Sequence, residues 1–382
     1  MKAKTIKGKT VEQVVEGLHQ SMADGFRPTL AVVFLSIKQD RQTICKLLDQ
    51  RGIAVFGVTT AGEFIDGEIG EQSTMIMLLD IKRDYFKLQF EEHDANKERE
   101  AARKIADIAL QTFSNPAFIV CGSGIKADGE MIIRGIEDIA GNQVTIFGGM
   151  AADDFSMTDT FVFTNNRCSN NGIVSVILNE DKIKLKGLTS IGWKPVGIVR
   201  TITKSNGCWV HTIDDQPALD MIIKYMGITL KKEKENEATE FLVNVSSNFP
   251  MAVQRENGSV VMRTAMLGNW SDNSFMCAGS VPQGANVRFC LPADFEVIDE
   301  VIDECREIKE KESFEAEAML MFSCKARHTA FGPLVSREIE GIKNVWNVPM
   351  VGFFTYGEFA RATKGNQEFH NISCCWVVMR EA

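Results

Sequence analysis

The sequence predicts an α/β protein of two modules, which are built from repeated strand-helix-strand-strand units with mixed sheets. Three observations support this fold class: an eight-residue motif that occurs three times, a similar series of apolar runs around each copy, and a helical spacing of apolar residues inside each series. The motif consists of Gly, five variable positions, an acid and Phe. Its copies cover residues 57–64, 148–155 and 352–359.

The segments around each copy follow the same order. An apolar run that ends in a small polar residue comes first, and the apolar residues after it are three and four positions apart, which places them on one face of a helix. A second apolar run leads into the motif, and a third run follows it. The three runs of each unit are 30–36, 53–56 and 74–79, then 117–123, 144–147 and 173–178, and finally 319–324, 348–351 and 372–379. The unit is therefore strand, helix, strand, acidic turn and strand.

Several helices are expected outside these units. Thr10 and Gln13 form a candidate capping box before an amphipathic helix that ends near Gly25. Two more amphipathic segments predict helices at 96–112 and 294–311. Each of these helices has an apolar stripe that must pack against another element.

The pattern changes after the second unit. Three antiparallel strands are expected at 183–191, 197–203 and 207–213, and a helix follows from Pro217. The charged run 231–240 predicts a loop, and a degenerate fourth unit is expected between 241 and 291. We place the boundary just before the helix, so the predicted modules are 1–213 and 214–382.

The composition narrows the class of protein. The chain has 382 residues, of which 45% are hydrophobic and 24% are charged, which is ordinary for a globular protein with more than one core. Its formal net charge of −9 argues against nucleic acids and anionic membranes as partners, because binding phosphates requires a basic surface. No apolar run reaches the roughly 18 residues of a membrane span, and the first residues are polar. We therefore expect a cytoplasmic protein.

The cysteines give no sign of a metal site. There are ten of them, and no two form a Cys-x-x-Cys pair. Most lie in apolar runs, where a free cysteine behaves as a small buried hydrophobic residue. We expect no metal and no cofactor, and Cys324 is the one thiol whose reactivity stays open.

Five motifs together resemble the FIST sensory-domain family. They are Gly57 to Glu63, Phe147-Gly148-Gly149 with Asp153-Asp154, Pro217-Ala218-Leu219-Asp220, Phe322-Ser323-Cys324 with Arg327, and Gly352 to Glu358. The resemblance covers residues 28 to 380 and includes an N-terminal and a C-terminal FIST module. It implies a sensor of small ligands, with amino acids proposed as ligands, in intracellular signal transduction. Because no kinase or cyclase segment follows the motifs, we expect the signal to pass to a separate protein.

A ligand site is expected where the strands of the units end. Ligands of open α/β sheets bind beyond the carboxyl ends of the strands. Glu63, Asp154 and Glu358 should occupy related positions there and suit an ammonium group or a divalent cation, while Arg327 would bind a carboxylate. The other candidate ligand-binding residues are Ser323, Cys324, Tyr356 and Gly357. The same acids could instead cap turns, and the glycines could only provide positive φ angles.

Two other functions stay open. Cys324 with Arg327 and His328 would be the nucleophile and its support in a thiol-dependent enzyme. The sequence contains no phosphate-binding loop, no His-Glu-x-x-His and no Gly-x-Ser-x-Gly, so we do not expect an enzyme. A protein-interaction scaffold would use the acidic face of the helix that begins near Asp294.

Overall fold

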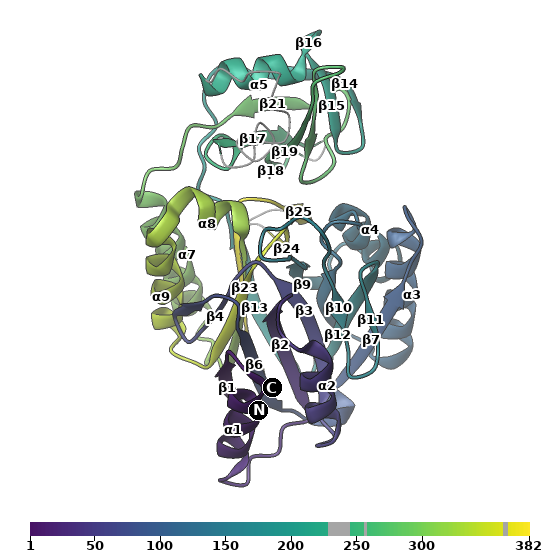
Figure 1. Ribbon diagram of the computed structural model, residues 1–382, viewed down its shortest axis with the longest axis vertical. Coiled ribbons are helices and arrows are strands. Elements are labelled where there is room, and N and C mark those ends of the chain that lie inside the picture. Colours follow the sequence, from purple (N-terminus) through teal and green to yellow (C-terminus); the bar gives the residue numbers. More distant parts are fainter. Residues whose placement is uncertain (228–244, 256–257, 362–365) are drawn as a thin grey trace.

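The computed structural model describes residues 1–227, 245–255, 258–361 and 366–382. Within these residues the strands form three six-stranded sheets and one eight-stranded sheet. Figure 1 shows a lower body that contains both chain ends and a smaller domain above it, formed by α5 and strands β14 to β21. The predicted α/β fold class is confirmed.

The three sheets of the body have the same strand order. A leading strand is followed by the third, first and second runs of one unit, with the first and second runs parallel and the third antiparallel. The first sheet contains β1 (Lys2–Gly8), β6 (Thr74–Asp80), β2 (Leu30–Ser36), β3 (Ala54–Thr60), β10 (Val162–Phe163) and β11 (Cys168–Ser169). The second contains β7 (Phe86–Glu92), β12 (Gly172–Asn179), β8 (Pro116–Gly122), β9 (Thr145–Met150), β24 (Glu358–Arg361) and β25 (Gln367–His370). The third contains β13 (Ile183–Ser190), β26 (Cys374–Glu381), β22 (Ala318–Cys324), β23 (Met350–Thr355), β4 (Glu63–Ile65) and β5 (Glu68–Gly70).

The last two strands of each sheet come from a different unit. The hairpin β4–β5 follows β3 in the chain but pairs with β23. The hairpin β24–β25 follows β23 but pairs with β9, and the hairpin β10–β11 follows β9 but pairs with β3. The three sheets therefore exchange their hairpins in a closed cycle. Strand pairing also joins the two predicted modules, because β13 and β4 both lie in the sheet of β22.

The sheets face one another around the largest apolar core, and the helices cover their outer faces. Phe34, Phe322 and Phe353 are wholly buried in this core, and the ring centroids of Phe34 and Phe353 lie 4.6 Å apart. The helices α1 (Val11–Met22) and α2 (Arg41–Asp49) pack on the first sheet, and α3 (Glu98–Thr112) and α4 (Gly129–Ala140) on the second. The third sheet is covered by α7 (Glu296–Glu312), α8 (Lys325–Phe331) and α9 (Val335–Trp346). Two short 3₁₀ turns are η1 (Arg83–Tyr85) and η2 (Gly332–Leu334).

The smaller domain is an antiparallel sheet with a core of its own. Its strands are, in spatial order, β18 (Val260–Arg263), β17 (Met251–Gln254), β21 (Asn286–Phe289), β14 (Arg200–Asn206), β15 (Trp209–Ile213), β20 (Ser274–Cys277) and β19 (Ala265–Asn269), with β16 (Gln216–Pro217) beside β15. The helix α5 (Ala218–Met226) packs on this sheet. The two chain segments that connect the domain to the body run side by side, since the amide of Val196 donates to the carbonyl of Phe289 at 2.8 Å.

Several elements agree with the sequence and two do not. Thr10 caps α1 by accepting from the amide of Gln13, as predicted. The strand expected at 183–191 is present as β13, but it pairs with β26 rather than with the strands that follow it. The expected fourth unit is also wrong, because the described strands of 251–289 are all antiparallel. Residues 231–240, where a loop was expected, lie outside the described residues.

Candidate functional site

Glu63 and Glu358 occupy equivalent buried positions at the start of β4 and β24. Each carboxylate accepts from the hydroxyl of the threonine three residues earlier, Thr60 or Thr355. Each also accepts from a serine hydroxyl just before the next long strand, from Ser73 at 2.8 Å and from Ser373 at 2.7 Å.

Burial raises the pKa of both carboxyl groups, although these hydrogen bonds oppose it. The pKa of Glu63 rises to about 7 and that of Glu358 to about 8. The shared Thr-x-x-Glu spacing in the first and third motifs is a sequence signal for this arrangement.

Asp154, the third acid of the series, has different surroundings. The second motif has Ala151 where the others have threonine, so the matching hydroxyl is missing. Asp154 has a left-handed backbone, with φ 53°, and its carboxylate accepts from Ser36 Oγ at 2.6 Å.

Asp153, which is part of a motif of the resemblance but was not among the predicted ligand residues, is the wholly buried acid of this turn. It accepts from the amides of Met157 at 3.1 Å, Thr158 at 2.6 Å and Asp159 at 3.0 Å. It also accepts from the hydroxyl of Tyr356 at 2.5 Å. The second and third motifs are therefore in direct contact, through Asp153 and Tyr356. Gly357 adds a further contact, because its carbonyl accepts from the amide that follows Gly149, at 2.8 Å.

Arg327 is wholly buried and bonded to other parts of the protein. Its guanidinium donates to both carboxylate oxygens of Glu338, which is also wholly buried. It donates further to the carbonyls of Ile191 at 2.7 Å and Ile372 at 3.2 Å. These contacts hold α8 against α9 and the segment before β26, and a ligand role for Arg327 stays a prediction.

Cys324 and Ser323 end β22 and are both buried. Burial raises the pKa of the Cys324 thiol well above its usual range, and the charge of Glu358 adds to this shift. Burial, and then the charge of Lys325, lower the pKa of His328 to about 4. A protonated thiol and a weakly basic imidazole are the reverse of what a thiolate nucleophile needs.

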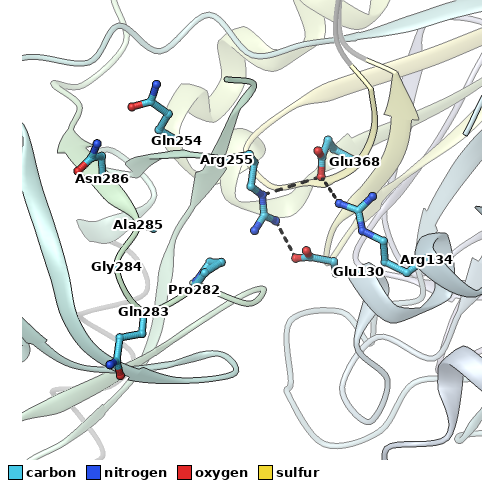
Figure 2. A pocket seen from close by; sticks show the side chains of 10 residues that line it. All are labelled: Glu130, Arg134, Gln254, Arg255, Pro282, Gln283, Gly284, Ala285, Asn286 and Glu368. Carbon is cyan, nitrogen blue, oxygen red and sulfur yellow. Dashed lines mark hydrogen bonds and ion pairs between the residues drawn. The ribbon is translucent and has the colours of Figure 1, made fainter. Parts of the chain in front are cut away.

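A cavity of about 640 Å³ lies where the smaller domain meets α4 and β25, and none of the eight predicted ligand residues lines it. Figure 2 shows a cluster of charged side chains on one side of it and the segment 282–286 opposite them. The lining residues are Glu130, Arg134, Gln254, Arg255, Pro282, Gln283, Gly284, Ala285, Asn286 and Glu368. This cavity is a candidate site that sequence reasoning missed.

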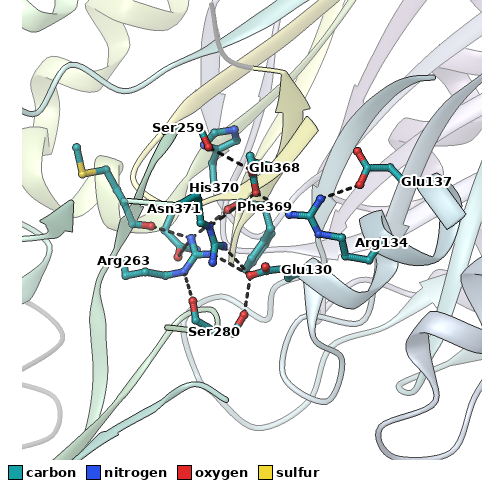
Figure 3. A network of polar contacts seen from close by, with 12 residues as sticks. Glu130, Arg134, Glu137, Ser259, Arg263, Ser280, Glu368, Phe369, His370 and Asn371 are labelled. Carbon is teal, nitrogen blue, oxygen red and sulfur yellow. Dashed lines mark hydrogen bonds and ion pairs between the residues drawn. The ribbon is translucent and has the colours of Figure 1, made fainter. Parts of the chain in front are cut away.

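Glu130, near the start of α4, connects the body to the smaller domain through hydrogen bonds (Figure 3). Its Oε2 accepts from Arg255 Nη2 at 2.7 Å, Arg263 Nη2 at 3.3 Å and Ser280 Oγ at 2.6 Å. Burial alone would raise the pKa of Glu130, but the two arginines outweigh it and hold this pKa below its usual value. Glu130 is therefore ionised at neutral pH.

Glu368 and Arg255 also belong to the cluster of charged side chains that lines this cavity. The carboxylate of Glu368 lies 3.4 Å from Arg134 Nη2 and 3.9 Å from Arg255 Nε. Only 7% of the Arg255 side chain is exposed, and its Nε has no hydrogen-bond partner among the described residues. A buried guanidinium donor without a partner is costly, so Arg255 is suited to receive an acceptor from a ligand.

Other possible sites are weakly supported. Within the described part of the chain, no three His, Cys, Asp or Glu side chains gather as ligands for a metal ion. No described helix is long and apolar enough to cross a membrane. On α7, the acids Asp299 and Glu300 form ion pairs with Arg337 and Lys194.

Comparison with known proteins identifies the family. The FIST N domain matches residues 29–216, and the FIST C domain matches residues 218–361. An uncharacterized protein of Methanocaldococcus jannaschii is 22% identical over 298 residues, which are 72% of this chain and 54% of the relative. The chain thus spans about half the length of this curated relative. FIST domains are sensory domains of signal transduction, and they bind small ligands. The chain therefore belongs to the FIST family.

Proposed function

We propose that this protein senses a small molecule that binds in the cavity between α4, β25 and the smaller domain. The observation that carries the proposal is the composition of the cavity wall, where Arg134, Arg255, Glu130 and Glu368 converge from both parts of the chain. Ligand sites are concave and contain a few convergent polar groups, and many lie between domains. A ligand that contacted both walls would favour one relative position of the body and the smaller domain.

An amino acid is the ligand class that fits this wall best. The two carboxylates and the two guanidinium groups have no net charge, so a zwitterion would enter without leaving a charge uncompensated. The Nε of Arg255 would donate to the ligand carboxylate, and Glu368 would accept from its ammonium group. A small dicarboxylate fits less well, because Glu130 and Glu368 would repel its second charge.

The proposed setting is the cytoplasm, and the proposed output is contact with a separate signalling protein. All ten cysteines are free, which supports a reducing compartment. The smaller domain is joined to the body by two adjacent segments, so ligand binding would change a surface that another protein can recognise.

The residues predicted from the sequence form a second candidate region. Asp154 and Tyr356 are only partly buried there, whereas Glu63, Glu358, Ser323 and Cys324 are buried. A ligand role for this group stays a prediction, and affinity measurements on Tyr356→Phe would test it.

Calorimetric titration with a panel of amino acids and small carboxylates tests the proposal. Arg255→Gln is expected to weaken binding at least tenfold, because it removes a charged hydrogen bond of about 1.5 to 3 kcal/mol. Arg306→Gln is the matched control, since Arg306 is an exposed arginine of α7 that pairs with Asp303. Thermal unfolding without ligand shows whether each variant is folded. If the folded Arg255→Gln variant and the wild type bound the ligand with equal affinity, the ligand would not bind in this cavity.

A further inference from the structure

The most exposed large apolar side chains gather where the smaller domain joins the body. Within the described residues the four highest exposures are those of Ile198 at 70%, Val199 at 58%, and Leu291 and Phe295 at 54% each. The first two lie in the segment 191–199, which leads from β13 into β14, and the other two in the segment 290–295, which leads from β21 into α7 (Figure 1). We call these four residues the connector patch. Single exposed apolar residues are common, but a group of them indicates an interaction surface.

The two connecting segments are adjacent and share a small cavity. Pro195 and Cys290 pair as an antiparallel bridge between them. The cavity has a volume of about 240 Å³, and residues of both segments and of α7 line it. They are Gly192, Lys194, Val196, Leu291, Pro292, Ala293, Asp294 and Val297. Leu291 of the connector patch is therefore at the edge of a hollow that an apolar side chain of a partner could enter.

The helix that begins at this patch is strongly acidic in its first half. Residues 296–305 of α7 contain five acids and no Lys or Arg. Asp294, which lines the cavity, is exposed, and so is Glu296. Lys194 Nζ lies 3.1 Å from Glu300, and Asp294 and Glu296 act on the same amine through their charge. Three carboxylates thus surround one ammonium group, which leaves negative charge in excess beside the apolar side chains.

This charge decides which kind of partner fits. A second copy of this chain fits poorly, because a two-fold interface would place the acidic part of α7 in one copy beside the same acids in the other. An anionic membrane surface would be repelled by the same carboxylates. A protein segment that has apolar residues on one side and lysines or arginines next to them complements both the patch and its acidic border.

We propose that the connector patch binds an amphipathic, basic helix of a separate signalling protein. Apolar side chains of this helix contact Leu291, Phe295 and the cavity between the segments, and its cations pair with Asp294 and Glu296. The inference rests on the proposed function for its role, since it names the surface through which a sensor of small molecules would reach its partner. Both connecting segments contribute to the patch, so a shift of the smaller domain relative to the body would change its shape.

Fluorescence anisotropy with a synthetic helix tests the proposal. The labelled peptide carries leucines on one face and lysines on the other, and it is titrated with the full-length chain. The double variant Leu291→Ser/Phe295→Ser is expected to weaken binding roughly tenfold or more, because it removes the apolar centre of the contact. Leu110→Ser is the matched control, since Leu110 is an apolar residue of α3 that is 45% exposed, and it should leave the affinity unchanged. Thermal unfolding shows that each variant is folded.

A scrambled peptide and a charge variant separate the two parts of the contact. A peptide of the same composition, with its leucines spread over all faces, should bind roughly tenfold more weakly or worse. Asp294→Asn/Glu296→Gln should lower the affinity for the amphipathic peptide and weaken its dependence on salt, whereas Glu100→Gln/Asp107→Asn on α3 should change neither.

Three results would overturn the proposal. They are no binding of the amphipathic peptide to the wild type, equal binding of the scrambled peptide, and a dimer in sedimentation equilibrium that the Leu291→Ser/Phe295→Ser variant abolishes. The last result would assign the patch to a second copy of the chain. None of them bears on the cavity beside Arg255, because calorimetry with the Arg255→Gln variant tests the proposed function separately.

Discussion

Replacing Glu358 by Gln is expected to change how the stability of the protein depends on pH. The carboxyl group of Glu358 is wholly buried and has a pKa of about 8 in the folded chain, against 4.5 for an unperturbed glutamate. Because the folded pKa is the higher one, this group contributes stability that is fully present below pH 4.5 and is lost as the pH rises toward 8. Unfolding near neutral pH releases about one proton from it, which costs about 1.4 kcal/mol of stability per pH unit.

The side-chain amide introduced by Glu358→Gln imitates the protonated carboxyl group. This amide can donate to Thr355 Oγ1 and accept from Ser373 Oγ, so the variant should be close to the wild type in stability at low pH. Between about pH 5 and pH 7 the wild type should lose roughly 2 to 3 kcal/mol relative to the variant. Urea unfolding curves of both proteins at several pH values measure this difference. The other titrating groups are the same in both proteins, so their contributions to the difference in stability cancel.

Two controls complete this experiment. Glu307→Gln removes one exposed charge from α7 and accounts for the change in net charge. Glu63→Gln should repeat the effect at a somewhat smaller size, since the pKa of Glu63 rises only to about 7. A difference between Glu358→Gln and the wild type that stays constant from about pH 5 to pH 7 would mean that Glu358 is ionised in the folded chain, and the reasoning would fail.

Three further perturbations test other parts of the structure. Glu338→Gln leaves Arg327 buried without a counter-ion and should cost about 3 to 5 kcal/mol in urea unfolding, so a loss below about 1 kcal/mol would contradict the pairing. Thr10→Ala removes the cap of α1 and should cost about 1 kcal/mol, measured as a lower thermal midpoint, while an unchanged midpoint would contradict the cap. Iodoacetamide at neutral pH should label the exposed Cys168 first and leave Cys324 unlabelled in the folded chain, whereas fast labelling of Cys324 would revive the thiol-enzyme hypothesis.

The local structure was predictable because periodicity is a local property. Apolar runs and helical spacing indicate strands and helices without knowledge of their partners. The capping role of Thr10 follows from residues three positions apart. The pairing of β13 with β26 was not predictable in this way, because the two strands are separated by the whole smaller domain and nothing in either strand specifies the other.

The candidate site was harder to predict for the same reason. Glu130, Arg255 and Glu368 meet in space from three distant parts of the chain, and each one alone is an ordinary charged residue. Arg327 was expected at a ligand, but its partner Glu338 lies on a different helix, outside the motif that drew attention to the arginine.

The exchange of hairpins among the three sheets has a consequence for how the chain folds. β4 pairs with β5 locally and with β23, so the hairpin near position 64 cannot join its sheet until residues near position 352 have been made. Contacts of such long sequence separation slow folding, because a large loop must close before the contact can form. During synthesis the edge of β9 would remain open until β24 is made, more than 200 residues later, and open edges are where chains pair wrongly. This topology therefore predicts that the chain needs a chaperone to fold, or that the yield of folded protein falls steeply at high expression.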